Sequence, residues 1–403
     1  MAYSHEYELD AQYIMPTFAR KPIEFVRGNG MQLFDDKGGA YLDFIGGIGV
    51  NCLGHSHPDL TAALQKQAET LLHVSNYYYI PGRGDLARKV NDLLNFSNNT
   101  QDTWKVFFAN SGAEANEAAV KIARLHAKRT GKSGGTILSI QGSFHGRTLA
   151  TLAATAQPLK QEDYKPLPAG FISTPLNDIS ALRETFAQHG NEICGVLIEV
   201  IQGESGIHPA TQEFLEEVRT LTETYDALMM CDEVQSGVFR CGVPFAFQAY
   251  GIVPDVVSIA KGIGGGVPMG MCAARNEIAD TFQPGDHGTT FGGSCLAVVA
   301  ANTVLDVIER DNIAKNVKEV GAYLREQLST LPHIKEVRGL GLMVAAEFDD
   351  SVDAPQVVFD ALKIEQGLIL NYTGKHTLRF LPPLVAKKAD IDILMSGLKK
   401  LLL

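Results

Sequence analysis

The 403-residue sequence contains few cysteines, and their spacing forms no metal-binding or redox motif. No two of them make a CxxC pair, and several stand within apolar runs, where cysteine behaves as a small hydrophobic residue. The six are Cys52, Cys194, Cys231, Cys241, Cys272 and Cys295. We therefore expect reduced thiols in a cytoplasmic protein.

Long hydrophobic runs and basic stripes are missing as well. No stretch approaches the ~18 apolar residues that a membrane span needs, so we expect no membrane helix. The opening segment from Met1 to Glu6 is polar and has no apolar signal core. A net charge of −11 without a basic stripe argues against a nucleic-acid surface.

The common nucleotide-binding motifs are incomplete. Gly131-Lys132-Ser133 has the ending of a P-loop, but His126 stands where the earlier glycine is required, and the segment follows an expected helix. The glycines around Gly262 and Gly339 lack the third member of a GxGxxG pattern. The sequence therefore gives little support to a nucleotide-binding fold.

A metal site is not expected either. His55 and His57 form an HxH pair, but no third ligand follows at a recognisable spacing. A loop that leads into a helix beginning at Pro58 explains this segment better.

One lysine stands at the end of a strongly apolar run. Val256–Ala260 reads as a buried strand, and Lys261 and a glycine cluster follow it at once. Burial disfavours the charged form of a lysine, which lowers its pKa and makes its amine nucleophilic. The glycines allow a bulky ligand to approach the backbone. An ordinary solvated lysine in a strand-to-loop turn is the alternative.

A carboxylate ends a second apolar run. Leu228–Cys231 reads as another buried strand, and Asp232 follows it. Pyridoxal phosphate requires a lysine that bonds to it covalently and an acid that keeps its ring nitrogen protonated. Lys261 and Asp232, at the ends of two strands, supply these two groups.

The chain resembles the class III (ω-) aminotransferases of fold type I, and within them the acetylornithine aminotransferases. The resemblance extends from the Gly28-Asn29-Gly30 turn to the segment 378–383 and covers several separate motifs. It implies an α/β fold: a large domain with a mostly parallel, seven-stranded type of sheet and a smaller α+β domain. It also implies a homodimer with shared active sites.

A turn of small residues is the candidate phosphate site. The strand Trp104–Ala109 should lead into a helix opened by Ser111, Gly112 and Ala113, whose free N–H groups and positive dipole end suit a phosphate. An ordinary helix with Ser111 as N-cap is the alternative. The resemblance assigns this turn to the cofactor phosphate.

Other cofactor contacts rest on the resemblance alone. It assigns Gln235 to the cofactor and implies that Thr290, in the loop His287–Gly293, reaches the phosphate of the neighbouring subunit. Phe144 follows the expected strand Thr136–Gln141 and matches the aromatic residue that stacks on the cofactor ring.

Four residues are candidates for substrate binding. The guanidinium of Arg147 suits bidentate pairing with a carboxylate, although a structural ion pair is the alternative. The resemblance implies that Arg379 binds the carboxylate beside the reacting amine and that Glu199 neutralises it when no carboxylate is present. It also places Ile48 where ornithine enzymes have a tyrosine, so an acylated α-amine should be preferred.

The expected organisation has three segments. Residues 1–57 form an N-terminal arm and part of the small domain, 58–305 the large cofactor-binding domain, and 306–403 the C-terminal small domain. The chain departs from the family pattern at Val238-Phe239 and at Ser294-Cys295, which places the local loop shape in question.

The resemblance implies transfer of the terminal amine of N2-acetylornithine to 2-oxoglutarate, giving N-acetylglutamate semialdehyde and glutamate, in arginine biosynthesis. Ornithine, succinylornithine, 4-aminobutyrate or lysine-type amines are alternative donors. An aminomutase of the same fold, or a binding protein that kept the fold without the cofactor, are further alternatives.

Overall fold

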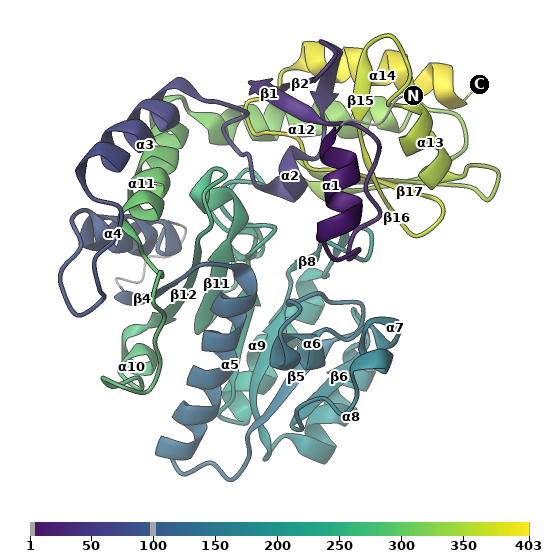
Figure 1. The fold of residues 1–403 in the computed structure, drawn as a ribbon. Coiled ribbons are helices and arrows are strands. Elements are labelled where there is room, and N and C mark those ends of the chain that lie inside the picture. The colour runs from purple at the N-terminus through teal and green to yellow at the C-terminus, as the bar shows by residue number, and fades with distance from the viewer. Residues whose placement is uncertain (1–4, 97–101, 403) are drawn as a thin grey trace.

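The computed structural model describes residues 5–96 and 102–402. Its centre is a seven-stranded sheet in which only β12 runs antiparallel to its neighbours, β11 and β4 (Figure 1). In sheet order the strands are β4 (Trp104–Ala109), β12 (Gly270–Arg275), β11 (Val256–Ala260), β10 (Leu228–Asp232), β7 (Ile193–Ile198), β5 (Thr136–Ile140) and β6 (Phe171–Thr174). The expected mostly parallel sheet is confirmed.

Helices cover this sheet and account for the apolar strand sequences. Every residue of β7, β10 and β11 is buried, as expected for central strands with both faces covered. The covering helices are α5 (Gly112–Arg129), α6 (Leu149–Ala154), α7 (Pro158–Gln161), α8 (Ile179–His189), α9 (Gln212–Thr224) and α10 (Asn276–Ala279). On one flank α3 (Pro58–Thr70), α4 (Arg83–Leu94) and α11 (Cys295–Arg310) pack together (Figure 1).

Strand pairing places the two predicted reactive residues at one edge of the sheet. β10 and β11 run parallel, with Asp232 opposite Ser258. Lys261 follows directly after β11, so both side chains come from the carboxyl ends of adjacent parallel strands. That edge is the usual position of ligands in open α/β sheets.

The N-terminal segment pairs with the C-terminal part of the chain. The expected hairpin is present as β1 (Phe25–Asn29) and β2 (Gln32–Asp35), followed by β3 (Ala40–Asp43). Strand β15 (Gly367–Ile369) then pairs parallel with β3. The preceding helix α1 (His5–Tyr13), in the expected N-terminal arm, has no buried residue.

A four-stranded antiparallel sheet occupies the C-terminal region. It consists of β13 (Ile334–Leu340), β14 (Met343–Phe348), β17 (Thr377–Phe380) and β16 (Asn371–Thr373), covered by α12 (Ile313–Leu328), α13 (Ala354–Asp360) and α14 (Lys388–Leu402). Strands β13 and β14 form an antiparallel hairpin, and polar side chains interrupt the apolar pattern of β13.

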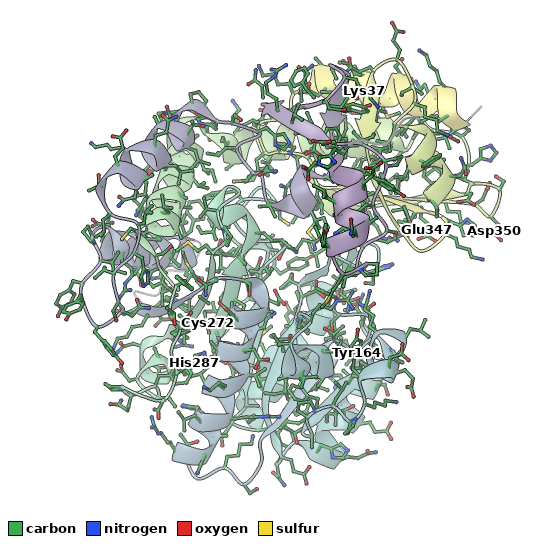
Figure 2. The ribbon with its side chains drawn as sticks, in the orientation of Figure 1. Lys37, Tyr164, Cys272, His287, Glu347 and Asp350 are labelled. Carbon is green, nitrogen blue, oxygen red and sulfur yellow. The ribbon has the colours of Figure 1, made fainter. Side chains whose placement is uncertain are left out.

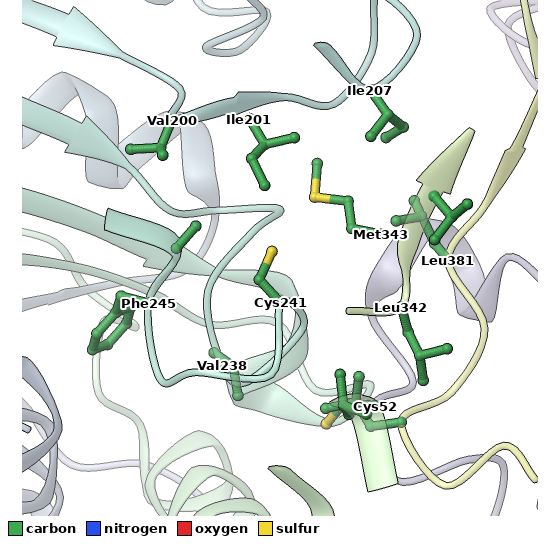
Figure 3. Close-up of a cluster of buried hydrophobic side chains, with 14 of the residues drawn as sticks. Cys52, Val200, Ile201, Ile207, Val238, Cys241, Phe245, Leu342, Met343 and Leu381 are labelled. Carbon is green, nitrogen blue, oxygen red and sulfur yellow. The ribbon is translucent and has the colours of Figure 1, made fainter. Parts of the chain in front are cut away.

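One continuous core joins the two large parts of the molecule. Figure 3 shows Cys241 between Phe245 on one side and Met343 and Leu381 on the other, and these residues belong to one buried apolar cluster with Val238. The described cysteines are all buried and unpaired. Across residues 5–96 and 102–402, no helix has the length and apolar character to cross a membrane. The segment boundaries at 57/58 and 305/306 stay a prediction.

Candidate active site

A cavity of about 460 Å³ lies at the carboxyl ends of β10 and β11. It brings together most of the residues that the sequence singled out. These are Ser111, Gly112, Ala113, Phe144, Arg147, Glu199, Asp232, Gln235 and Lys261. Ile48, Thr290 and Arg379 do not line it.

Lys261 sits in a strained backbone position at the start of a short 3-10 helix. Its φ of +51° is in the left-handed region, which non-glycine residues rarely adopt and which often marks a functional site. Burial lowers the pKa of the Lys261 amine to about 8, although the charge of Asp232 opposes the shift. An amine with this pKa can act as a nucleophile near neutral pH.

Asp232 is held by three hydrogen bonds and is only 3% exposed. Its Oδ2 accepts from Asn116 Nδ2 at 2.7 Å and lies 2.8 Å from His145 Nδ1, while its Oδ1 accepts from the Val234 N–H at 3.0 Å. Because an ionised carboxylate can only accept, the imidazole donates. His145 Nε2 and Asn116 Oδ1 are buried without a partner among the described residues.

Sequence reasoning missed His145 and Asn116. Both stand among other polar residues, Asn116 between Glu114 and Glu117, so the local sequence did not mark them as buried. Their partner Asp232 is 87 and 116 positions away, so no local pattern predicts the contacts.

The start of α5 forms the opposite wall of the cavity. Ser111 is the N-cap of this helix, and its Oγ accepts from the Glu114 N–H at 3.2 Å, while its role in phosphate binding stays a prediction. The turn packs too closely for larger residues: a Cβ on Gly112 would lie 2.7 Å from Val234 Cγ1. The helix therefore presents its N-terminal dipole to the cavity, an arrangement that favours an anion.

Phe144 and Arg147 lie together on one side of the cavity. The Arg147 guanidinium is 5.4 Å from the centroid of the Phe144 ring. The Phe144 N–H donates to Glu199 Oε2 at 2.9 Å, which ties this loop to the end of β7. Arg147 is exposed and keeps its donors available at the mouth of the cavity.

Glu199 and Arg379 are neighbours that do not pair with each other in the described structure. Glu199 Oε1 accepts from the Gly203 N–H at 3.1 Å, and Arg379 Nη1 donates to the Gly203 carbonyl at 2.9 Å. Arg379 also donates twice to Asn371 Oδ1. Burial raises the pKa of the Glu199 carboxyl to about 7, so much of it is protonated near neutral pH.

Glu204 is a carboxylate to which the sequence reading assigned no role. Burial lowers the pKa of Arg379, and the charge of Glu204 opposes this shift more strongly than that of Glu199. Glu204 also raises the pKa of Lys261, so its charge acts on the cavity. Its present partner is Lys160, whose Nζ lies 2.9 Å from Oε1. Its position in the motif Gln202-Gly203-Glu204 was the feature of the sequence that could have identified it as a site residue.

Ile48 lies in a left-handed turn two residues before Val50, which lines the cavity. Its φ of +67° is rare for a β-branched side chain, and the glycines on either side of it also have positive φ. The side chain is 40% exposed.

Thr290 is exposed and lines a separate hollow of about 930 Å³ that also includes Asn76, Lys121 and His287. In Figure 2 His287 is labelled on the side of the molecule away from Tyr164. The ring of His287 lies against Phe107, with centroids 4.6 Å apart.

The segments outside the expected pattern have clear local structures. Val238 and Phe239 both have positive φ, and the loop is fixed by the buried Arg240, which donates to the Leu342 carbonyl at 3.1 Å. Ser294 precedes α11 as its N-cap. His55 Nε2 bonds to Asp43 at 2.8 Å.

The comparisons with known proteins agree with this site. The sequence pattern of the aminotransferase class-III family matches residues 15–402, and the chain belongs to that family. A curated acetylornithine aminotransferase from Caldanaerobacter subterraneus is 45% identical over 95% of each chain. An ornithine aminotransferase from Toxoplasma gondii, solved with partial occupancy of PLP at its active site, has a TM-score of 0.91 at 29% identity, covering 98% of this chain and 93% of its own. The N-acetylornithine aminotransferase from Stenotrophomonas maltophilia has a TM-score of 0.82 at 32% identity, covering 98% and 97%.

The protein is a pyridoxal-phosphate-dependent aminotransferase. The residues fit that cofactor on the geometry alone. A part-buried lysine with a lowered pKa, a buried aspartate and a helix N-terminus surround one cavity, as a covalently held, ring-protonated phosphate ester requires.

Proposed function

We propose that this enzyme transfers the terminal amine of N2-acetylornithine to 2-oxoglutarate, in arginine biosynthesis. One observation carries the proposal: a buried arginine, Arg379, lies beside carboxylates, and a second arginine, Arg147, lies at the mouth of the cavity. The names of the curated relatives at about 40–45% identity support the same donor.

The inner residues serve both half-reactions. Lys261 holds the cofactor and then moves a proton at the amine-bearing carbon. Asp232 would keep the ring nitrogen protonated, and Ser111, Gly112 and Ala113 would hold the phosphate. Phe144 would stack on the ring, and Gln235 would also bind the cofactor. When bound, pyridoxal phosphate supplies an electron-withdrawing ring that stabilises negative charge at that carbon.

The outer residues must accept two donors that differ at the reacting carbon. Glutamate has a carboxylate there, which Arg379 binds, whereas the terminal carbon of acetylornithine has none. A buried arginine without its partner is costly, by about 3–5 kcal/mol. A carboxylate of the enzyme must therefore neutralise Arg379 in the acetylornithine half-reaction, while Arg147 binds the remote carboxylate in both.

Glu204 is better suited than Glu199 to neutralise Arg379. Two backbone N–H groups already hold Glu199, and burial raises its pKa to about 7, so it is a poor fixed negative charge. Glu204 is part-exposed, and its charge has the larger effect on Arg379. We therefore assign Glu204 to the role that the sequence gave to Glu199, and Glu199 to holding Phe144 and Gly203.

Ile48 supports an acylated donor. An isoleucine cannot form a hydrogen bond with a free α-amine, so it offers nothing to ornithine that would offset desolvation of the amine. The same residue tolerates 4-aminobutyrate, which remains the alternative donor, together with ornithine and succinylornithine.

We further propose a cytoplasmic homodimer in which Thr290 reaches the partner's cofactor phosphate. The exposure of Thr290 outside the Lys261 cavity supports a contact in trans. Thr290→Ala should weaken cofactor binding by about tenfold, the loss expected for one hydrogen bond to a charged group. A sedimentation experiment that finds an active monomer would contradict the trans contact.

A donor panel tests the substrate. Purified holoenzyme is given acetylornithine, succinylornithine, ornithine or 4-aminobutyrate with 2-oxoglutarate, and glutamate formation is measured. We expect acetylornithine to exceed ornithine and 4-aminobutyrate in kcat/KM by about 10- to 200-fold, the range that pocket contacts of this kind provide. Equal use of free ornithine would refute the proposed donor.

A further inference from the structure

Lys160 lies near the outer part of the site and is bound to a residue of that site. It belongs to the short helix α7, and its Nζ lies 2.9 Å from Glu204 Oε1. The two side chains are 25% and 28% exposed, so neither is fully solvated. Lys160 Nζ is also 5.9 Å from the centroid of the Phe144 ring, the ring that Arg147 approaches at 5.4 Å.

Glu204 therefore interacts with two cations, one by direct contact and one through its charge. It forms an ion pair with Lys160, and its charge also raises the pKa of Arg379. Arg379 meanwhile has other acceptors, because its guanidinium donates to the Gly203 carbonyl and to Asn371. Among the described residues Arg379 therefore has no direct ion pair. Its charge is available to the carboxylate of an incoming substrate.

We propose that Lys160 sets the balance between the two half-reactions by holding Glu204 away from Arg379 whenever a substrate carboxylate occupies that arginine. In the other half-reaction Glu204 leaves Lys160 and neutralises Arg379. This inference rests on the proposed function, because it requires that Glu204 is the neutralising carboxylate.

The physical reason is the cost of an unpaired, part-buried carboxylate. When glutamate or 2-oxoglutarate binds, Glu204 must give up Arg379, and Lys160 offers a second cation within hydrogen-bond distance. Without that cation, Glu204 would compete with the substrate carboxylate for Arg379. When Glu204 moves to Arg379, the released ammonium of Lys160 reaches solvent and stays near the face of Phe144.

The test compares the two half-reactions in single turnovers of the holoenzyme, followed by cofactor absorbance. Lys160→Met should lower kcat/KM for glutamate about fivefold, which corresponds to about 1 kcal/mol. The acetylornithine half-reaction should change by less than about twofold. Lys160→Arg should restore the wild-type ratio. Lys160→Gln has the same predicted effect as Lys160→Met and replaces it if the methionine variant is insoluble.

Lys165→Met is the matched control. Lys165 is a more exposed lysine that forms an ion pair with Glu162 at 2.6 Å instead of with Glu204. Its loss should leave both half-reactions unchanged. A general effect of removing a surface charge would instead appear in both variants.

A double-mutant cycle tests whether Lys160 acts through Glu204. In a Glu204→Gln background, Lys160→Met should have no further effect on the glutamate half-reaction. An equal loss in both half-reactions, no loss in either, or a loss that persists without Glu204 would overturn the proposal. If acetylornithine is not a donor at all, the proposed function fails, yet the glutamate half-reaction still reports whether Lys160 acts through Glu204.

Discussion

The two ends of the active-site cavity are built differently. The inner end consists of strand termini and a helix start: Lys261 after β11, Asp232 at the end of β10, and Ser111 before α5. The outer end consists of loops, and Arg147 is the charged residue that lines the cavity there. Glu204, in another loop, and Arg379, on β17 of the C-terminal sheet, lie beyond the cavity lining. Under the proposed function, rigid elements hold the groups whose positions must not change, and side chains that exchange partners surround the part of the substrate that differs between the half-reactions.

Hydrogen bonding follows the same division. Asp232 has three fixed donors and is nearly inaccessible. Glu204 has one part-exposed lysine and lies in the field of a second cation. Changes at the inner end should therefore impair both half-reactions equally, and changes at the outer end should separate them.

The largest effect is expected at Lys261. Lys261→Ala should lower turnover with either donor by at least about 10⁴-fold, because both covalent attachment and proton transfer are lost. Borohydride reduction of the wild-type holoenzyme should fix the cofactor to the peptide that contains Lys261, as mass spectrometry can show. Labelling at another lysine would refute the assignment.

Asp232 should have the next largest effect. Asp232→Ala should keep the cofactor bound but lower both half-reactions by about 10²–10³-fold, the usual loss when one preorganised electrostatic group is removed. Asp232→Asn is the matched variant, since it preserves the shape of the side chain and removes its charge. Near-normal turnover of either variant would contradict the role of the carboxylate.

At Glu199 we expect a smaller effect, which concerns the free energy of unfolding and its dependence on pH. Burial raises the pKa of its carboxyl from 4.5 to about 7, so its contribution to stability is fully present below about pH 4.5 and is lost as the pH rises through about 7. Between pH 5 and pH 8 the free energy of unfolding of the apo-enzyme should fall by about 2–3 kcal/mol, because one pKa unit corresponds to 1.36 kcal/mol. The Glu199→Gln variant should not show this decrease.

Denaturant unfolding at the two pH values measures this difference, with the exposed Glu326→Gln as control. If the wild type and Glu199→Gln respond identically to pH, then the carboxyl is ionised throughout, and Glu199 remains a candidate for neutralising Arg379.

The inner end could be predicted from the sequence because each part has a local signature. Apolar runs predicted strands β10 and β11 and the residues at which they end. Because the two strands are parallel, Asp232 and Lys261 lie at the same edge of the sheet. The small-residue turn gave the N-cap at Ser111. The family resemblance then supplied the roles of these groups.

The outer end depends on contacts between distant segments, which no local pattern specifies. Arg379 donates to Gly203 across 176 positions, and Lys160 meets Glu204 across 44. The choice between Glu199 and Glu204 also depended on burial, because both residues stand in the same short motif. The sequence alone could not distinguish a carboxylate held by backbone N–H groups from one that is free to exchange partners.

The most direct test of this division measures single turnovers with glutamate and with acetylornithine for Asp232→Asn and for Glu204→Gln. We predict that Asp232→Asn slows both half-reactions by the same factor. Glu204→Gln should slow the acetylornithine half-reaction by about tenfold or more and leave the glutamate half-reaction within about twofold of wild type, because only the first requires a neutralised Arg379. Equal damage to both half-reactions in Glu204→Gln would contradict the account.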